Sequence, residues 1–243
     1  MDCLYIVVPA YNEEENIADV IRQWHPVVEK VGGDSRLLIL NDGSKDSTYE
    51  KMLALRENYP RLLPVDKENQ GHGATVLRGY RYAITHGADY VFQTDSDGQT
   101  LPEEFWPLWR DRKNGGLLIG YRKGRQDGMS RVVVTKVLRL VLFACFGVWV
   151  LDANTPFRLM EASQLEEVME KIPKNFNLSN VVMTVVYEKF GLGVHYYPIT
   201  FRPRQGGTNS INLKRIFGIG RQALKDFWKL RRRYAAELRR KRG

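Results

Sequence analysis

Short apolar runs alternate with longer segments of helical periodicity through the first half of the chain. Such alternation is typical of an open α/β sheet whose strands are joined by crossover helices. The apolar runs predict strands at residues 4–10, 36–41, 62–66, 90–94 and 117–121. The segments between them predict helices at residues 13–31, 47–59, 74–86 and 103–112, with a break or kink at Pro26.

Polar clusters follow three of the predicted strands. Tyr11-Asn12-Glu13 follows the first strand, Asp42-Gly43-Ser44 the second, and Asp95-Ser96-Asp97 the fourth. Functional groups in parallel sheets gather at the carboxyl ends of the strands. We therefore expect these three clusters to form one site.

The second half of the chain has a different pattern. An apolar segment at 131–151 carries Lys136 and Arg139, and its charge-free part, 140–151, is shorter than the roughly 20 residues that a membrane span needs. This favours a buried core helix or an amphipathic helix lying on a bilayer over a membrane-spanning helix. Further predictions are a helix at 178–190, a strand at 193–202 and a glycine-rich loop at 204–208.

The positive charge is confined to the end of the chain. The 243 residues are 43% hydrophobic, which excludes a disordered chain, and the formal net charge is +9. Residues 213–243 hold 12 basic and 2 acidic side chains, whereas residues 1–212 hold 25 and 26. We therefore predict a neutral body at 1–212, divided into halves at 1–127 and 128–212, followed by a basic tail at 213–243.

Apolar residues recur in this tail at helical intervals. They are Leu213, Ile216, Phe217, Leu224, Phe227, Trp228, Tyr234 and Leu238. The pattern predicts a basic amphipathic helix, which suits an anionic membrane surface. A helix partly packed on the body with a solvated end, or one that joins copies of the chain, would show the same pattern.

Two features favour a cytoplasmic protein. Cys3 and Cys145 offer no basis for a disulfide framework, and the first residues lack the basic region and the apolar length of a signal peptide.

The carboxylates of Asp95 and Asp97 are the strongest candidates for chemistry. Two carboxylates at a turn after a strand can hold a divalent cation together with substrate phosphates, although an Asp-x-Asp pair is also common in solvated turns. Asp42 at a strand end can accept a hydrogen bond from a base or ribose. Tyr11 and Glu13 suit a nucleobase, although Glu13 is also favoured in a first helical turn.

One more motif suits an anion. The segment Gln70-Gly71-His72-Gly73-Ala74 can present backbone N–H groups to an anion at a helix start, or form a plain turn. The four histidines, including His72, show no triad or metal-ligand spacing.

Four motifs follow one another along the first half of the chain: Val7-Val8-Pro9-Ala10-Tyr11-Asn12-Glu13-Glu14, Asn41-Asp42-Gly43-Ser44, Asn69-Gln70-Gly71-His72-Gly73 and Asp95-Ser96-Asp97-Gly98-Gln99. In this arrangement the chain resembles family 2 glycosyltransferases. Within this family the chain is similar to the dolichol-phosphate mannosyltransferase and polyprenyl-phosphate glycosyltransferase branch. The segments that carry this similarity are Gly120-Tyr121-Arg122, Ser130-Arg131, Asp152 to Leu159 and Arg202 to Thr208. The resemblance extends to about residue 210.

The resemblance implies an α/β fold of the GT-A type, which is a Rossmann-like, mostly parallel sheet flanked by helices. It implies that Pro9, Tyr11, Glu13 and Asp42 hold the nucleoside, and that Asp95, Asp97 and Gln99 hold Mg²⁺ or Mn²⁺ and the diphosphate sugar. Arg122, Arg131 and Arg204 would face donor and acceptor phosphates. Asp152 would be either a catalytic base or a structural anchor for the region of Arg158.

The implied activity is inverting, metal-dependent transfer of a mannose- or glucose-class sugar from a GDP- or UDP-sugar to a polyprenyl or dolichyl phosphate. Members of this branch often carry transmembrane helices, whereas the pattern of this sequence predicts none. We therefore expect an anchoring partner protein, a homo-oligomer or direct binding to the cytoplasmic membrane face to bring the enzyme to its lipid. A glycan, protein or small-molecule acceptor is the alternative. Nucleic-acid binding through the tail is disfavoured because the body has no basic face.

Overall fold

The structure is a computed structural model that describes residues 2–122, 129–174, 176–204, 206 and 213–240. For residues 129–134 and 213–220 it describes the helical backbone alone.

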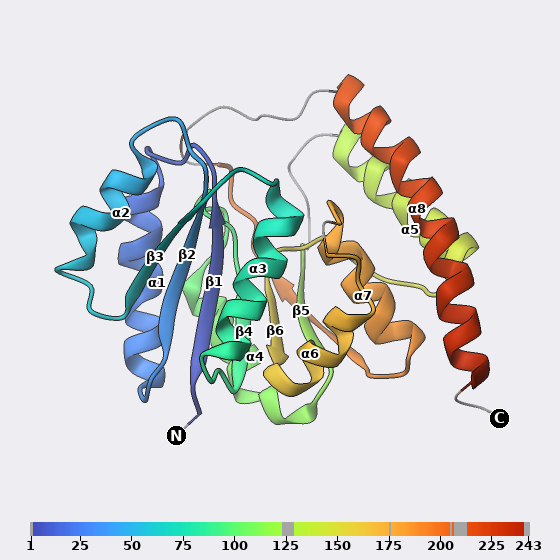
Figure 1. Ribbon diagram of the computed structural model, residues 1–243, viewed down its shortest axis with the longest axis horizontal. Coiled ribbons are helices and arrows are strands. Elements are labelled where there is room, and N and C mark those ends of the chain that lie inside the picture. Colours follow the sequence, from blue (N-terminus) through green and yellow to red (C-terminus); the bar gives the residue numbers. More distant parts are fainter. Residues whose placement is uncertain (1, 123–128, 175, 205, 207–212, 241–243) are drawn as a thin grey trace.

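A sheet of seven strands forms the centre of the described protein (Figure 1). In chain order the strands are β1 (Leu4–Ala10), β2 (Arg36–Asp42), β3 (Leu62–Lys67), β4 (Tyr90–Gln93), β5 (Leu117–Arg122), β6 (Arg158–Glu161) and β7 (Val194–Ile199). Their order across the sheet is β3-β2-β1-β4-β6-β5-β7. Only β6 runs against its neighbours, so the sheet is mostly parallel, as predicted.

Helices cover both faces of the sheet (Figure 1). They are α1 (Ile17–Val31), α2 (Thr48–Arg56), α3 (His72–Thr85), α4 (Phe105–Arg110), α5 (Met129–Phe146), α6 (Ala162–Glu170), α7 (Ser179–Lys189) and α8 (Leu213–Arg240). Single 3₁₀ turns at Pro102–Glu104 and Arg112–Asn114 flank α4.

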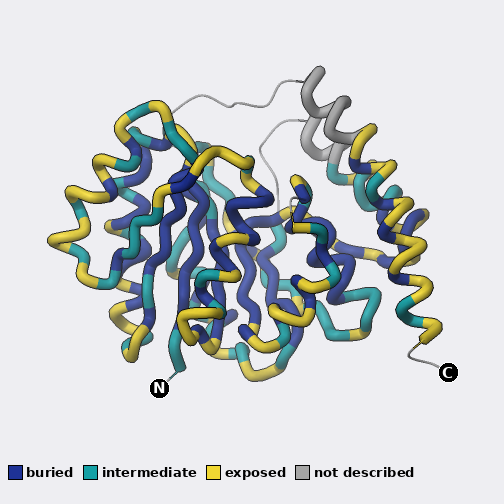
Figure 2. Tube along the Cα trace, in the orientation of Figure 1, coloured by how far each residue is buried: buried dark blue, intermediate teal, exposed yellow. Residues whose placement is uncertain are grey.

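The alternation of side chains along each strand divides the apolar core into two layers. On β1, Leu4, Ile6 and Val8 pack with α1, α2 and α4, whereas Tyr5 and Val7 pack with α3 and the helices of the second half. Figure 2 shows the buried strands between partly exposed helices. Because β1 to β5 run in the same direction, their carboxyl ends lie at one edge of the sheet, whose two faces are both covered.

Most predicted elements are confirmed, and two were missed. Helix α1 continues through Pro26, so of the predicted break or kink the break is wrong and the kink stays a prediction. The predicted helix at 103–112 is an α-helix of six residues between 3₁₀ turns. Strand β6 and helix α6 lay in a stretch for which the sequence pattern gave no assignment.

The apolar segment predicted at 131–151 contributes α5, which has one buried and one exposed side. Leu142, Cys145 and Phe146 are buried, while Leu140 and Phe143 are exposed. None of the helices in the described ranges is long and apolar enough to cross a membrane.

The C-terminal helix α8 lies beside α5 at one end of the molecule (Figure 1). Ala223, Phe227, Leu230 and Tyr234 lie on its buried face and belong to the core layer of α3, α6 and α7. The ring of Phe227 is 5.7 Å from that of Phe146, and the Tyr234 hydroxyl donates to the carbonyl of Lys171 at 3.0 Å. This partial packing on the body is one of the three arrangements that the sequence allowed. The predicted division of the chain into a body at 1–212 and a tail at 213–243 stays a prediction.

Candidate functional site at the carboxyl edge

The loops after β1 and β2 are bonded to each other. Asn12 adopts a left-handed backbone conformation, φ 54°, and its N–H donates to Ser44 Oγ at 3.0 Å. In return, Lys45 N–H donates to Asn12 Oδ1 at 2.8 Å. Beside this pair, Pro9 and Ala10 end β1, which is buried along its whole length, and Tyr11 directly after it is exposed. The two loops thus form one surface on which the ring of Tyr11 is free to meet a planar ligand.

Asp42 ends β2 and is almost fully buried. Its carboxylate forms an ion pair with Lys67 and accepts hydrogen bonds from the N–H groups of Gln70 and Gly71, each at 2.9 Å. Lys67 also donates to Thr75 Oγ1 at 3.0 Å. Asp42 therefore ties the loop 68–71 to the sheet, and its predicted contact with a nucleoside stays a prediction.

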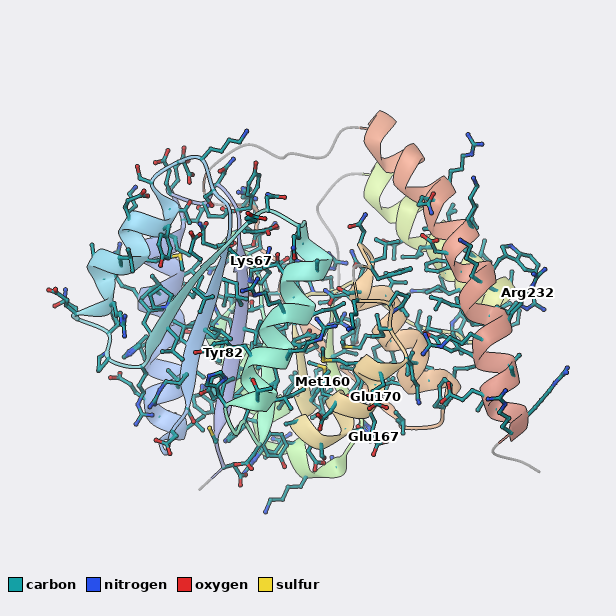
Figure 3. All side chains as sticks on the ribbon, viewed as in Figure 1. Lys67, Tyr82, Met160, Glu167, Glu170 and Arg232 are labelled. Atoms are coloured by element: carbon teal, nitrogen blue, oxygen red, sulfur yellow. The ribbon has the colours of Figure 1, made fainter. Side chains whose placement is uncertain are left out.

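Sequence reasoning missed Lys67, which Figure 3 shows among the side chains near the upper ends of the strands. The predicted third strand ended at residue 66, but β3 extends to Lys67, which lies directly opposite Asp42 in the parallel register. A lysine at the end of an apolar run was the available signal.

The close fit at the start of α3 requires glycine. A Cβ on Gly73 would lie 2.2 Å from the carbonyl oxygen of Phe176. The Gln70–Ala74 motif therefore serves close packing of α3 against the second half. Its His72 reaches the functional edge, with Nε2 3.1 Å from Asp95 Oδ1. Desolvation alone would lower the pKa of His72, but the Asp95 carboxylate raises it overall.

Asp95 and Asp97 lie in a loop that is fastened on several sides. Ser96 Oγ donates to the carbonyl of Pro9 at 2.8 Å, and the hydroxyls of Thr94 and Thr100 are 2.7 Å apart. Gln99 N–H donates to Asp97 Oδ1 at 3.2 Å. These bonds hold both carboxylates at the end of β4, next to the exit of β1.

The electrostatics of this loop suit a cation. Burial, and then the negative charge of Asp95, raise the pKa of Asp97 to about 7. A carboxylate that is disfavoured as an anion beside a second carboxylate suits a divalent ion, because a cation reduces both the repulsion from Asp95 and the desolvation cost of Asp97. Within the described ranges no group of three or more histidine, cysteine or acidic residues could hold a metal ion.

The raised pKa predicts that the metal-free protein loses stability as pH rises. Between the ordinary value of 3.8 and the folded value of about 7, folded Asp97 keeps a proton that the unfolded chain releases. This contribution is complete below the unfolded pKa and is lost as pH rises through the folded pKa. We would measure the free energy of unfolding of Asp97→Asn and of wild type in urea with a chelator present. From pH 3 to pH 8 the difference in this free energy should shift in favour of the variant by on the order of 1–3 kcal/mol. An unchanged difference between the two pH values would contradict this.

A segment from the end of the chain's second half crosses this edge. Arg204 pairs with both oxygens of Glu13 at 2.7 Å, and Asn16 donates to Glu13 Oε2 at 2.7 Å. Burial raises the pKa of Glu13, although Asn16 and Arg204 act against the rise. Gln99 exchanges hydrogen bonds with the backbone of Arg202, at 2.8 and 2.9 Å. The structure thus brings Glu13, Gln99 and Arg204 together.

Arg122 and Asp152 form a second pair at this edge. The Arg122 guanidinium donates to both Asp152 oxygens, at 2.7 and 2.8 Å, and lies 5.0 Å from the ring centre of Phe201. Asp152 therefore holds Arg122, whereas its predicted role as base or anchor stays a prediction. Arg131 belongs to α5, and its side chain lies outside the described part of the structure.

Sequence comparison identifies related proteins. The profile of Glycosyl transferase family 2 matches residues 5–134. Undecaprenyl-phosphate 4-deoxy-4-formamido-L-arabinose transferases of Salmonella paratyphi B and Salmonella newport are 29% identical over 140 residues, which are 56% of this chain. The aligned part is 42% of each relative's length, so the chain spans less than half of these proteins.

Structural comparison supports the fold. Glucosyl-3-phosphoglycerate synthase from Mycobacterium tuberculosis with UDP has a TM-score of 0.69 at 20% identity, covering 95% of this chain and 80% of the synthase. Its complex with Mn²⁺, UDP and phosphoglyceric acid gives 0.72 at 19% identity, covering 95% and 78%. The predicted GT-A fold is thereby confirmed.

Proposed function

Because the chain belongs to glycosyl transferase family 2, we propose that this glycosyltransferase moves one sugar from a nucleotide-sugar to a polyprenyl phosphate, with inversion at the anomeric carbon and with Mg²⁺ or Mn²⁺. The observation that carries the proposal is the pair of neighbouring carboxylates, Asp95 and Asp97, on the edge that also presents Tyr11 and the paired Arg122; burial and the charge of Asp95 disfavour ionisation of Asp97.

The relatives support the choice of ligands. The printed name of the Salmonella enzymes gives undecaprenyl phosphate as acceptor, and the similar solved structures hold UDP with Mn²⁺. We propose a mannose- or glucose-class sugar carried on UDP or GDP.

The donor would lie across the loops after β1, β2 and β4. Tyr11 would cover the base, with Pro9 and Glu13 beside it. Asp42, at the end of β2 and bonded to the loop 68–71, would hold the nucleoside. Asp95, Asp97 and Gln99 would meet the diphosphate, where a bound divalent ion stabilises the charge of the departing nucleoside diphosphate.

The acceptor phosphate would be oriented by arginine. A hydroxyl acceptor needs a base to take its proton, but a phosphate monoester is already an anion, so alignment and charge neutralisation suffice. Asp152 presents Arg122 at this edge, and Arg204, held by Glu13, lies beside the donor residues. We assign Arg131 the same task from the start of α5. Asp152 then acts as the anchor of Arg122 and takes no proton.

A direct test offers the purified protein four donors, UDP-glucose, UDP-galactose, GDP-mannose and UDP-N-acetylglucosamine, each with a short polyprenyl phosphate and Mn²⁺ or Mg²⁺. The expected result is a sugar-phosphate-lipid product from one donor, absent with chelator. Transfer to the nonphosphorylated polyprenol, or to glycans in preference to the phosphate, would contradict the proposed acceptor.

We further propose that this chain binds peripherally to the cytoplasmic face of a membrane through exposed apolar side chains. Val137, Leu140 and Phe143 form a stripe along α5, and the exposed ring of Phe143 lies 6.0 Å from that of Trp149. Leu151 is exposed as well, and its carbonyl accepts a hydrogen bond from Arg139 of α5 at 2.5 Å. Such exposed apolar side chains next to basic ones suit the interface of an anionic bilayer.

Helix α8 would supply the positive charge beside the patch. Its described part, residues 221–240, contains eight basic and two acidic residues. Arg231 donates to the carbonyl of Ala144 at 3.5 Å and lies 5.0 Å from the ring of exposed Trp228, so this flank of α8 adjoins α5. Arg232 points away from the sheet (Figure 3). Charges near an anionic surface add about 1 kcal/mol each before screening.

Vesicle flotation tests the membrane proposal. The double variant Leu140→Ser, Phe143→Ser should bind vesicles containing phosphatidylglycerol at least about tenfold more weakly than wild type, because two large apolar side chains no longer enter the interface. Leu53→Ser on α2 is the control, since Leu53 is 43% exposed on another helix. Equal binding by the double variant and wild type, or no binding by wild type, would contradict the proposal.

A further inference from the structure

Arg158 is a fully buried arginine that the proposed reaction does not use. It is the first residue of β6, the one reversed strand, between β4 and β5 at the carboxyl edge. Within the described residues its guanidinium forms no ion pair. All its hydrogen bonds go to backbone carbonyls: to Thr155 at 2.6 and 3.1 Å, to Asn180 at 3.0 Å and to Ala153 at 3.3 Å.

These bonds join two parts of the chain. Ala153 and Thr155 belong to the irregular segment before β6, and Asn180 lies in the first turn of α7. Thr184 Oγ1 adds bonds to the carbonyls of Ala153 and Asn180, at 3.1 and 3.0 Å. Arg158 therefore clamps the segment 153–155 against the start of α7.

Stability alone does not explain a charged residue at this position. Burial lowers the pKa of Arg158, which means that the surroundings disfavour its charge. Apolar residues of similar volume often replace buried charges without loss of stability. The directional bonds of a guanidinium to several carbonyls instead fix one backbone conformation.

The clamped segment directly follows Asp152, the residue that holds Arg122. A displacement of the backbone at Ala153 would move the Asp152 carboxylate, and with it the guanidinium of Arg122, which donates two short hydrogen bonds to that carboxylate. A shift of about 1 Å in a group that positions a substrate can cost roughly 10²-fold in rate.

We propose that Arg158 is a positioning residue for the acceptor phosphate, acting through the segment 153–155 and the Asp152–Arg122 pair. The proposal rests on the proposed function, because it takes the acceptor to be a phosphate bound by Arg122. It assigns no role to Arg158 in donor binding.

The test compares acceptor KM with nucleoside diphosphate affinity in Arg158→Lys. Lysine keeps the charge but cannot reach the same set of carbonyls, so we expect acceptor KM to rise about tenfold or more while the Kd of UDP or GDP with Mn²⁺ stays within about twofold. The control is Arg112→Lys, which changes another arginine that donates to a backbone carbonyl, that of Trp109, away from this edge. It should leave both values unchanged.

A double-variant cycle separates positioning from general destabilisation. If Arg158 acts through Arg122, Arg158→Lys should add little to the acceptor KM of Arg122→Lys. Fully additive increases, or an equal weakening of nucleoside diphosphate binding, would overturn the proposal.

Asp152→Asn keeps the test decisive if Arg158→Lys does not fold. It leaves the carbonyl clamp in place and weakens the link to Arg122, so acceptor KM should again rise with nucleoside diphosphate Kd unchanged. An unchanged acceptor KM would overturn the inference alone. Wild type that transfers no sugar to polyprenyl phosphate would overturn the proposed function and this inference together.

Discussion

Asp97→Asn is expected to reduce sugar transfer by at least about 10²-fold at saturating donor and metal, because the amide weakens the site for the divalent ion that stabilises the leaving diphosphate. The loss corresponds to about 3 kcal/mol of transition-state stabilisation. Initial rates with Mn²⁺ from micromolar to millimolar would measure it.

The matched control is Asp34→Asn. Asp34 is an exposed aspartate in the turn before β2, at the opposite end of that strand from Asp42. Its replacement should leave the rate within about twofold, as is usual for an exposed surface position. Full activity of Asp97→Asn would remove Asp97 from the catalytic site, whereas equal losses in both variants would point to an effect outside it.

Phe227→Ala is expected to lower the free energy of unfolding by about 3–5 kcal/mol, the usual range for a phenylalanine in a packed core. Phe227 is 1% exposed and its ring stands near those of Phe146 and Phe176. The adjacent Trp228 is 52% exposed, so Trp228→Ala should cost less than about 1 kcal/mol. Urea denaturation of both variants would measure the difference.

This pair of variants decides whether the basic helix is part of the folded body. A large loss for Phe227→Ala means that cutting the chain after residue 212 would expose the core around Phe146, and donor binding would fall with stability. Near-equal, small losses for the two variants would instead describe a helix that hardly contributes to the fold, and would support a separable tail.

The strands and the donor-side loops could be predicted because their signals are local. An apolar run followed by Asp42 or by Asp95 and Asp97 marks a strand and its functional end. Strand β6 could not be found in this way, since it has four residues and begins with the charged Arg158. The carbonyls that satisfy this buried arginine include that of Asn180, 22 positions away.

The partners of the site residues were equally inaccessible to local reasoning. Glu13 meets Arg204 across 191 positions of the chain, and Asp42 meets Lys67 because β2 and β3 pair in register. The tail illustrates a different limit. Its periodicity predicts an amphipathic helix, but the same apolar stripe can face a membrane or a protein core, and only the packing of Phe227 and Tyr234 shows the second.

The central claim is that the carboxyl edge of β4 holds the donor diphosphate through a divalent ion. Crystals grown with Mn²⁺ and a nucleoside diphosphate, measured at the manganese absorption edge, test it most directly. The account predicts an anomalous peak within coordination distance of Asp95 or Asp97 and of the diphosphate, with the base against Tyr11. A nucleoside diphosphate bound elsewhere, or manganese held away from both carboxylates, would contradict it.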